Sequence, residues 1–186
     1  MIVAIGVPVV QSLEAGSGVP GDTVVALMAA GAFAGLLWWS DFDRPQPALE
    51  RFAGTLPDNQ RGRFVRDVYT YAHAPLVAGI VLSAAVLEKI TLHPTEPLAL
   101  PFRMMLFGGL ALVVVGDVAA VARTFRLIAR ERIAAAAVLL LLVVLSGRWD
   151  GIVLLVAVDL VILGTLVTEH LRIEHPSAAA AAPGGP

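Results

Sequence analysis

Long runs of mostly apolar residues are the feature that most constrains how this chain of 186 residues can fold. A helix that spans the hydrocarbon core of a bilayer needs about 20 such residues, because each residue advances the helix by about 1.5 Å. Five runs reach or approach that length, and they cover about 23–42, 67–92, 100–122, 132–147 and 151–171. The sequence therefore predicts an all-α membrane protein, with a bundle of about five transmembrane helices within residues 1–175.

The composition favours lipid over water as the solvent. Apolar residues make up 58% of the chain and charged residues 15%, whereas ordinary soluble domains carry about 25% charged residues. The chain has no cysteine, which excludes disulfides, thiolate nucleophiles and cysteine-based metal sites. Its net charge of −2 provides no basic field for nucleic acid. We expect the lipid bilayer, and no nucleic acid, as its partner.

The fourth run is the shortest, with 15 uncharged residues from Ile133 to Gly147. A helix of that length reaches only about 22 Å, so flanking arginines must snorkel if it is to span, and a re-entrant segment is the alternative. Five spans would place ten Lys and Arg residues on one side and three on the other. Because cytoplasmic loops are rich in these residues, we predict a plasma-membrane protein whose C-terminus is cytoplasmic.

Three segments lie outside the predicted spans. Residues 1–10 are apolar but too short to span, and they lack the features of a signal peptide. We expect them to be the tail end of a truncated N-terminal helix. The polar segment 43–66, with several prolines and five arginines, is expected to be an exposed loop. The Ala/Pro/Gly-rich segment 176–186 is expected to be a disordered tail.

The second run carries polar residues around an internal proline. Pro75 removes one helical hydrogen bond, that of the Tyr71 carbonyl, and predicts a kink. Tyr69 and His73 are four residues apart and share a helix face, and Glu88 falls about 60° round from His73. One interpretation is a polar track for ions or protons. The alternative is that these residues lie at the membrane interfaces and have no transport role.

Two acidic residues fall inside other runs. Asp117 lies toward the end of the third run, and Asp159 lies near the middle of the fifth. A charge at mid-bilayer costs roughly 2.5–3.5 kcal/mol on insertion scales. The functional hypothesis is that these carboxyl groups coordinate a proton or a cation. The alternative is an interhelical hydrogen bond or ion pair that fixes the packing.

Small and aromatic residues mark the first run. Gly31 and Gly35 form a GxxxG pair, which allows close approach of another helix. The pair predicts packing within the chain or, alternatively, a homo-oligomer. Trp38 and Trp39 at the end of the same run predict an aromatic belt at the membrane surface.

No pattern in the sequence indicates catalysis. A P-loop, a GxSxG nucleophile elbow, a dinucleotide fingerprint and an HExxH zinc motif are all missing. The cluster at the end of the fifth run does not match HExxH and predicts a solvated helix end; it consists of Glu169, His170, Glu174 and His175. We therefore expect neither an enzyme nor a cofactor nor a metal site.

Several strings resemble the bacterial low temperature requirement A (LtrA) family. They are IVAIG at 2–6, LWW followed by FD within 37–43, YAHAPLVAGIVLSA at 71–84, Glu88 and His93-Pro94. The string YxHxPLVxGIV is the most specific of them. Family members are longer multi-pass membrane proteins with several helices before the IVAIG string. The resemblance implies that this chain is the C-terminal portion of the family's membrane domain.

The resemblance also bears on function. The family name implies a link to growth in the cold, and it supplies no catalytic residues. His73, Glu88 and His93 match the family pattern. Transport or ion translocation linked to cold or stress physiology predicts that Asp159 faces other helices or a cavity. The alternatives are a structural or regulatory membrane protein, which predicts no cavity, and a truncated remnant of a longer member.

Overall fold

The computed structural model describes Val10 and residues 19–42, 45–125 and 130–174. Most of these residues are helical and no strand occurs among them, although a bridge pairs Pro97 with Asp150. The predicted all-α fold is confirmed. Apart from Val10, the helix tail expected within 1–10 lies outside the described residues, and so does the tail expected at 176–186.

The elements follow one another as α2 (Gly21–Phe42), α3 (Pro45–Thr55), α4 (Asp58–Arg66), the π-helix η1 (Asp67–Ala72), α5 (His73–Leu92), α6 (Leu100–Phe125), α7 (Arg130–Leu145), the 3-10 helix η2 (Ser146–Arg148) and α8 (Gly151–Glu174). Four stretches of the described helices are long and apolar enough to cross a membrane, at 21–41, 73–92, 100–119 and 151–171. A shorter apolar helix covers 134–148, where the sequence predicts a short span. The chain is therefore a multi-pass membrane bundle.

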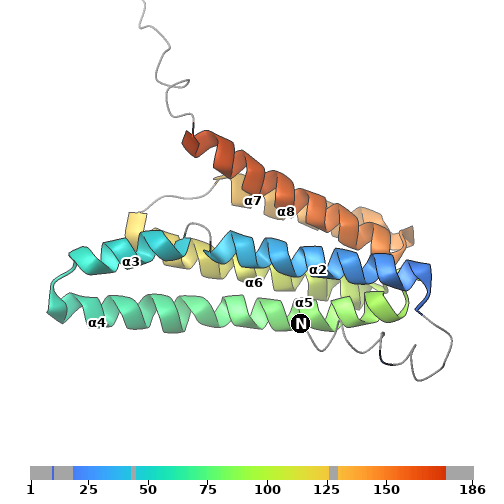
Figure 1. Cartoon of the computed structure of the whole chain (residues 1–186), viewed down its shortest axis with the longest axis horizontal. Coiled ribbons are helices and arrows are strands. Elements are labelled where there is room, and N and C mark those ends of the chain that lie inside the picture. Colours follow the sequence, from blue (N-terminus) through green and yellow to red (C-terminus); the bar gives the residue numbers. More distant parts are fainter. Residues whose placement is uncertain (1–9, 11–18, 43–44, 126–129, 175–186) are drawn as a thin grey trace, which may run out of the picture.

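Consecutive spanning helices run in opposite directions, so their connections gather at two ends of the bundle (Figure 1). The connections 93–99 and 146–150 lie at one end, called here the loop end. The hairpin of α3 and α4 lies at the other, called here the hairpin end. Helix α5 packs mainly against α6, whereas α8 packs against α2 and α7. The largest fully buried apolar side chains are Phe33, Leu87, Ile90, Leu106, Leu154 and Leu155.

Small residues allow α5 and α6 to approach closely. A Cβ atom added to Gly79 would collide with the carbonyl oxygen of Gly109. A Cβ atom on Gly109 would lie 2.6 Å from Ser83 Oγ and 2.8 Å from the Gly79 carbonyl oxygen. Such contacts are how helices associate in lipid, where apolar burial between helices provides little driving force. The close crossing of α5 and α6 therefore involves Gly79 and Ser83, four residues apart, whereas the GxxxG pair of α2 makes no such contact among the described residues.

The segment 43–66 corrects one prediction. The sequence suggested an exposed loop, but 45–55 and 58–66 are helices that form a hairpin. The Phe52 and Phe64 rings pack with their centroids 5.2 Å apart. Arg61 Nε donates to the Ala53 carbonyl at 3.1 Å, and its guanidinium also donates to the Leu56 carbonyl at 3.2 Å. The arginine thus holds the C-terminal end of α3 against α4.

The prolines explain why the loop prediction was wrong. Pro45 and Pro47 fall in the first turn of α3, and Pro57 is the N-cap of α4. A helix start tolerates proline, because the N–H groups of the first turn have no partner within the helix. These prolines therefore begin helices here. The sequence interpretation took them as signs of irregular structure.

Helices α4, η1 and α5 form one continuous helical segment over 58–92, which begins earlier than the expected start near Asp67. Pro75 lies in the first turn of α5, directly after the π-helical turn Asp67–Ala72. Proline has no backbone N–H to donate, and the π-helical turn is where the helix accommodates the missing hydrogen bond. The 15 residues of α4 and η1 extend about 22 Å beyond the span that starts at His73.

Candidate functional site

A small cleft lies among α2, α6, α7 and α8. Its lining consists of Leu37, Ser40, Leu110, Val113, Val114, Asp117, Ala135, Leu139, Ile162, Thr165, Leu166 and Glu169. Leu110, Leu139 and Ile162 lie near the middle of their helices, whereas Ser40 and Glu169 lie near the hairpin end. The cleft therefore reaches from the hairpin end to about the centre of the bundle.

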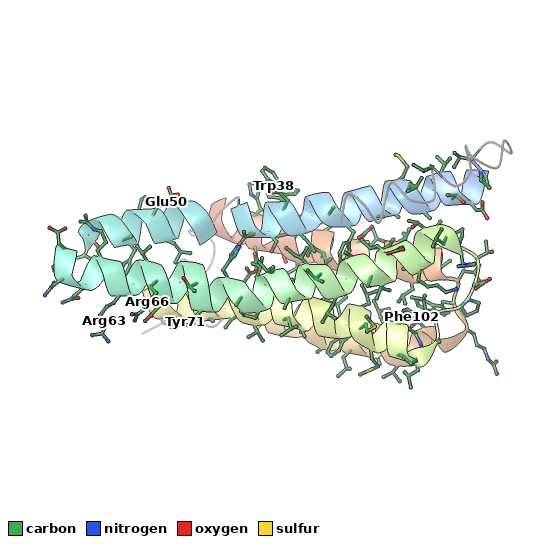
Figure 2. The ribbon with its side chains drawn as sticks, turned by 90° about the horizontal axis from the view of Figure 1, so that it is seen from below. Trp38, Glu50, Arg63, Arg66, Tyr71 and Phe102 are labelled. Carbon is green, nitrogen blue, oxygen red and sulfur yellow. The ribbon has the colours of Figure 1, made fainter. Side chains whose placement is uncertain are left out.

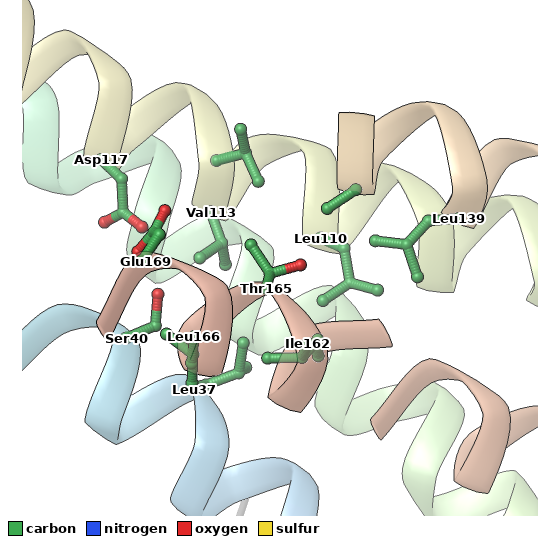
Figure 3. Close-up of a pocket in the computed structure, with 12 residues that line it drawn as sticks. Leu37, Ser40, Leu110, Val113, Asp117, Leu139, Ile162, Thr165, Leu166 and Glu169 are labelled. Carbon is green, nitrogen blue, oxygen red and sulfur yellow. The ribbon is translucent and has the colours of Figure 1, made fainter. Parts of the chain in front are cut away.

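Polar groups gather at the hairpin end of this cleft. Asp117 is 3% exposed and comes from α6, and the half-buried Glu169 comes from α8. Figure 3 shows their carboxyl groups turned toward each other, with the Ser40 hydroxyl of α2 beside them. Three helices thus bring two carboxyl groups and a hydroxyl to one place.

The opposite part of the cleft is apolar. Leu110, Leu139 and Ile162 project into it from three different helices (Figure 3). Thr165 is the polar exception, but its hydroxyl donates to the Val161 carbonyl of its own helix at 2.8 Å. The cleft therefore has an acidic end and an apolar end.

Asp159 lies just beyond the apolar end, near the middle of the span of α8. It is 9% exposed, and its Oδ1 atom has no hydrogen-bond partner among the described residues. Asp159 does not line the cleft itself. It precedes Ile162 by one helical turn and Leu166 by seven residues, so all three share one helix face. The carboxyl group is thus buried behind the inner end of the cleft.

The structure does not bring the polar residues of the second run into this cleft. His73 is half-buried at the start of α5, Glu88 is exposed near its end, and neither lines the cleft. The side chain of Tyr69 lies outside the described part of the structure. The buried face of α5 passes through Gly79 and Ser83. Whether His73 and Glu88 act together stays a prediction.

Sequence analysis missed Glu169 and Ser40 as site residues. Glu169 was expected at a solvated helix end, but it lines the cleft. The spacing Asp159, Ile162, Leu166, Glu169 follows one face of a helix, and that signal was available in the sequence. Ser40 follows Leu37 by three residues on the buried face of α2. No sequence signal distinguished this serine from an ordinary polar residue at a helix end.

The two glycines of α2 do not pack within the described chain. Gly31 and Gly35 are exposed, and a Cβ atom added to either would have no described atom within 4 Å. The close packing predicted inside the chain is therefore not found for this pair among the described residues. Trp38 is exposed near the hairpin end of the same helix, as is Tyr71 on η1 (Figure 2). Both aromatic side chains lie where the helices leave their apolar spans.

The loop end of the bundle is fastened by polar contacts. The backbone N–H groups of Gly151 and Ile152 donate to the Glu96 and Pro94 carbonyls, both at 3.0 Å. The Glu96 carboxylate lies 3.2 Å from Lys89 Nζ and 3.2 Å from His93 Nδ1. The hydrogen bond from Lys89 and the nearby His93 lower the pKa of the Glu96 carboxyl. This end of the bundle is therefore closed by its own loops.

The arrangement of the helices shows which class of protein this is. Helices that can cross a membrane surround a cleft with an acidic end, and the described residues contain no group of three or more His, Cys, Asp or Glu that could hold a metal ion. The chain is an integral, multi-pass membrane protein.

Comparison with known proteins adds the family. The model of the family described as bacterial low temperature requirement A protein (LtrA) matches residues 1–167. The chain belongs to the LtrA family, as its sequence strings indicated. No curated protein and no solved structure gives a significant match.

Proposed function

We propose that the chain acts in ion translocation across the membrane, with Asp159 as the group that receives the ion. The observation that carries the proposal is the buried carboxyl group of Asp159, whose Oδ1 atom lacks a partner among the described residues. Ionisable residues inside a membrane are expensive to place there and commonly mark ion or proton pathways. A proton or a cation would supply the partner that the described protein groups do not.

The cleft supplies a route to Asp159 from the hairpin end. The hairpin end of the cleft, where Asp117 and Glu169 lie, would be the entrance. The inner end at Ile162 lies one helical turn from Asp159, or about 5 Å along the axis. The fastened loop end would have to open for release, as alternating access requires. In this proposal the cleft is the entrance of the path and the loop end is its exit.

The alternative is a structural or regulatory membrane protein without a substrate. That function predicts that the buried acids are neutralised by packing and that no cavity remains. The close crossing at Gly79 and Gly109 is compatible with it. The buried Oδ1 atom of Asp159, which has no hydrogen-bond partner among the described residues, and the cleft near it favour translocation. The proposal involves no chemical step on a substrate, so we do not assign an enzyme activity.

The test is ion movement in proteoliposomes that contain a trapped pH-sensitive dye. After a pH jump, vesicles with the wild-type protein should equilibrate faster than empty vesicles, and Asp159→Asn should remove the difference. Asparagine keeps the shape but cannot carry the charge. Asp58→Asn, on the exposed α4, is the matched control and should behave as wild type. Equal rates for wild type and Asp159→Asn would remove Asp159 from the pathway.

The orientation belongs to the same proposal. The described arginines Arg51, Arg61, Arg63 and Arg66 all lie at the hairpin end, and Figure 2 shows Arg63 and Arg66 far from the loop end. Because positive residues accumulate on the cytoplasmic side, we assign the hairpin end and the C-terminus to the cytoplasm of a bacterial plasma membrane. Ions would then enter the cleft from the cytoplasm. The physiological link to cold or stress comes from the family name alone.

Association of two copies is a separate proposal. The outward face of α2 that carries Gly31 and Gly35 is exposed and leaves room for close approach of another helix. Small residues four apart are a common feature of helix pairs in membranes. We propose that this face pairs with a second copy of the chain.

A further inference from the structure

The surroundings of Asp159 indicate which ion it receives. We infer that the ion is a proton, and that the Asp159 carboxyl group binds and releases it without a metal cation at that place. The inference names the substrate of the translocation proposed above and, as a statement about transport, rests on that function. As a statement about what Asp159 binds, it can be tested without any flux.

The carboxyl group of Asp159 has apolar neighbours along its own helix. Residues three or four positions away share its helix face. They are Leu155, Val156, Ile162 and Leu163. The nearest hydroxyl side chain of α8 along the sequence is Thr165, about 9 Å further along the axis, and it donates to the Val161 carbonyl at 2.8 Å. The helix α8 therefore supplies no second polar group beside Asp159.

The helices packed against α8 do not supply one either. Helices α2 and α7 pack most closely on it, and residues 24–37 of α2 and 134–145 of α7 are all apolar or glycine. Helix α5 makes a smaller contact with α8. Its buried hydroxyl, Ser83 Oγ, has no hydrogen-bond partner among the described residues, and the same holds for Asp159 Oδ1. Asp159, 9% exposed, is thus a lone carboxyl group in apolar surroundings.

The charged and titratable residues of the surrounding helices lie toward the helix ends. Glu169 is ten residues from Asp159 on α8, or about 15 Å along the axis. Asp117 of α6 lies beside Glu169 (Figure 3), and Arg103 of α6 donates to the Val143 carbonyl at 2.7 Å. The others are Asp22 and Asp41 on α2, His73, Glu88 and Lys89 on α5, Arg123 on α6, Arg130, Glu131 and Arg132 on α7, and His170, Arg172 and Glu174 on α8. Within the described part of the chain, none forms an ion pair or a hydrogen bond with Asp159.

A metal cation is poorly matched to a lone carboxyl group. Sodium and potassium ions enter proteins where several oxygen atoms replace their hydration shell, and calcium and magnesium require about six or more oxygen ligands. Asp159 offers two oxygen atoms, and the described residues contain no group of three or more His, Cys, Asp or Glu that could hold a metal ion. A metal cation at Asp159 would therefore lose its water without gaining a ligand shell.

A proton needs only one oxygen atom. Its binding converts the carboxylate into a neutral carboxylic acid with one O–H donor, and a neutral group is far less costly to bury than an unpaired charge. The proton comes from water and returns to water, so only O–H bonds form and break. The inner end of the cleft at Ile162 lies one helical turn from Asp159, and water there takes up the proton on release.

Infrared spectroscopy of the protein in nanodiscs tests what Asp159 binds. The difference between wild type and Asp159→Asn in sodium-free buffer should contain the C=O band of a protonated carboxyl group, which shifts in heavy water. Asp58→Asn, on the exposed α4, should leave this band in place. In wild type the band should disappear at alkaline pH, and sodium, potassium or magnesium chloride at constant pH should not change it. A band lost on addition of one of these salts but kept in choline chloride, or no such band at any pH, would overturn the inference.

A flux assay separates the inference from the proposed function. With N-methylglucamine as the only other cation and thiocyanate to compensate charge, wild-type proteoliposomes should equilibrate pH as fast as in sodium or potassium buffer. Labelled sodium should not accumulate. Sodium uptake that Asp159→Asn abolishes would support translocation and refute the proton as its substrate. If no ion moves, translocation fails, and a salt-resistant band still supports proton binding at Asp159.

Discussion

Adjacent glycines in α6 provide a matched test of the close crossing of α5 and α6. A Cβ atom added to Gly109 would lie 2.8 Å from the backbone oxygen of Gly79 and 3.2 Å from the backbone nitrogen of Ser83. Ordinary contact begins near 3.4 Å. Backbone atoms cannot rotate away, so Gly109→Ala must push α5 and α6 apart. Overpacking of this kind destabilises proteins by about 1–3 kcal/mol.

Gly108→Ala is the internal control, because a Cβ atom added there meets nothing within 4 Å. Both substitutions bring the same gain in helix propensity, about 0.5–1 kcal/mol. The difference between the variants therefore isolates the steric term, and Gly109→Ala should be less stable than Gly108→Ala by about 1–3 kcal/mol. Unfolding in mixed micelles, followed by tryptophan fluorescence, measures it. Equal stabilities would refute the close crossing of α5 and α6.

Three further predictions concern other parts of the chain. Arg61→Ala should increase proteolysis of the α3–α4 hairpin, because two backbone carbonyls lose their donor, whereas Arg63→Ala should leave it unchanged; equal cleavage of both variants would contradict the role of Arg61. The lowered pKa of Glu96 means that its contact with Lys89 stabilises the fold above pH 4.5 and that this contribution is lost as the pH falls through the lowered value. The stability difference between wild type and Glu96→Gln should therefore vanish in acid. A difference that grows in acid would contradict this pH dependence. Gly35→Leu should reduce energy transfer between labelled copies in liposomes, and undiminished transfer would exclude that face from self-association.

Hydropathy was sufficient to predict the spans, because a bilayer requires long apolar helices whatever their partners. The stretch 151–171 has the bounds expected from the sequence, whereas the stretch 73–92 starts six residues after the expected start at 67. The helical nature of α3 and α4 was missed, since proline is compatible both with a loop and with a helix start. Pattern alone could not decide between them.

The partners of each helix could not be predicted from hydropathy. Lipid and a protein core are equally apolar, so the lipid-facing and buried sides of a spanning helix look alike in composition. The GxxxG pair at Gly31 and Gly35 was therefore singled out from the sequence, whereas the close crossing at Gly79 was not. Glu169 was missed for the same reason. It lines the cleft, and the sequence does not show which side of α8 faces the other helices. The sequence identified Asp117 and Asp159 as candidate site residues, but it did not show that Asp117 and Glu169 line the same cleft.

The most direct test of the central claim is whether blocking the Asp159 carboxyl group stops ion movement. Dicyclohexylcarbodiimide is an apolar reagent that modifies protonated carboxyl groups in membranes. Mass spectrometry can locate the modified residue in proteoliposomes used for the flux assay. The account predicts modification at Asp159, with flux lost in proportion to the modified fraction. Full flux from protein that is completely modified at Asp159 would contradict it.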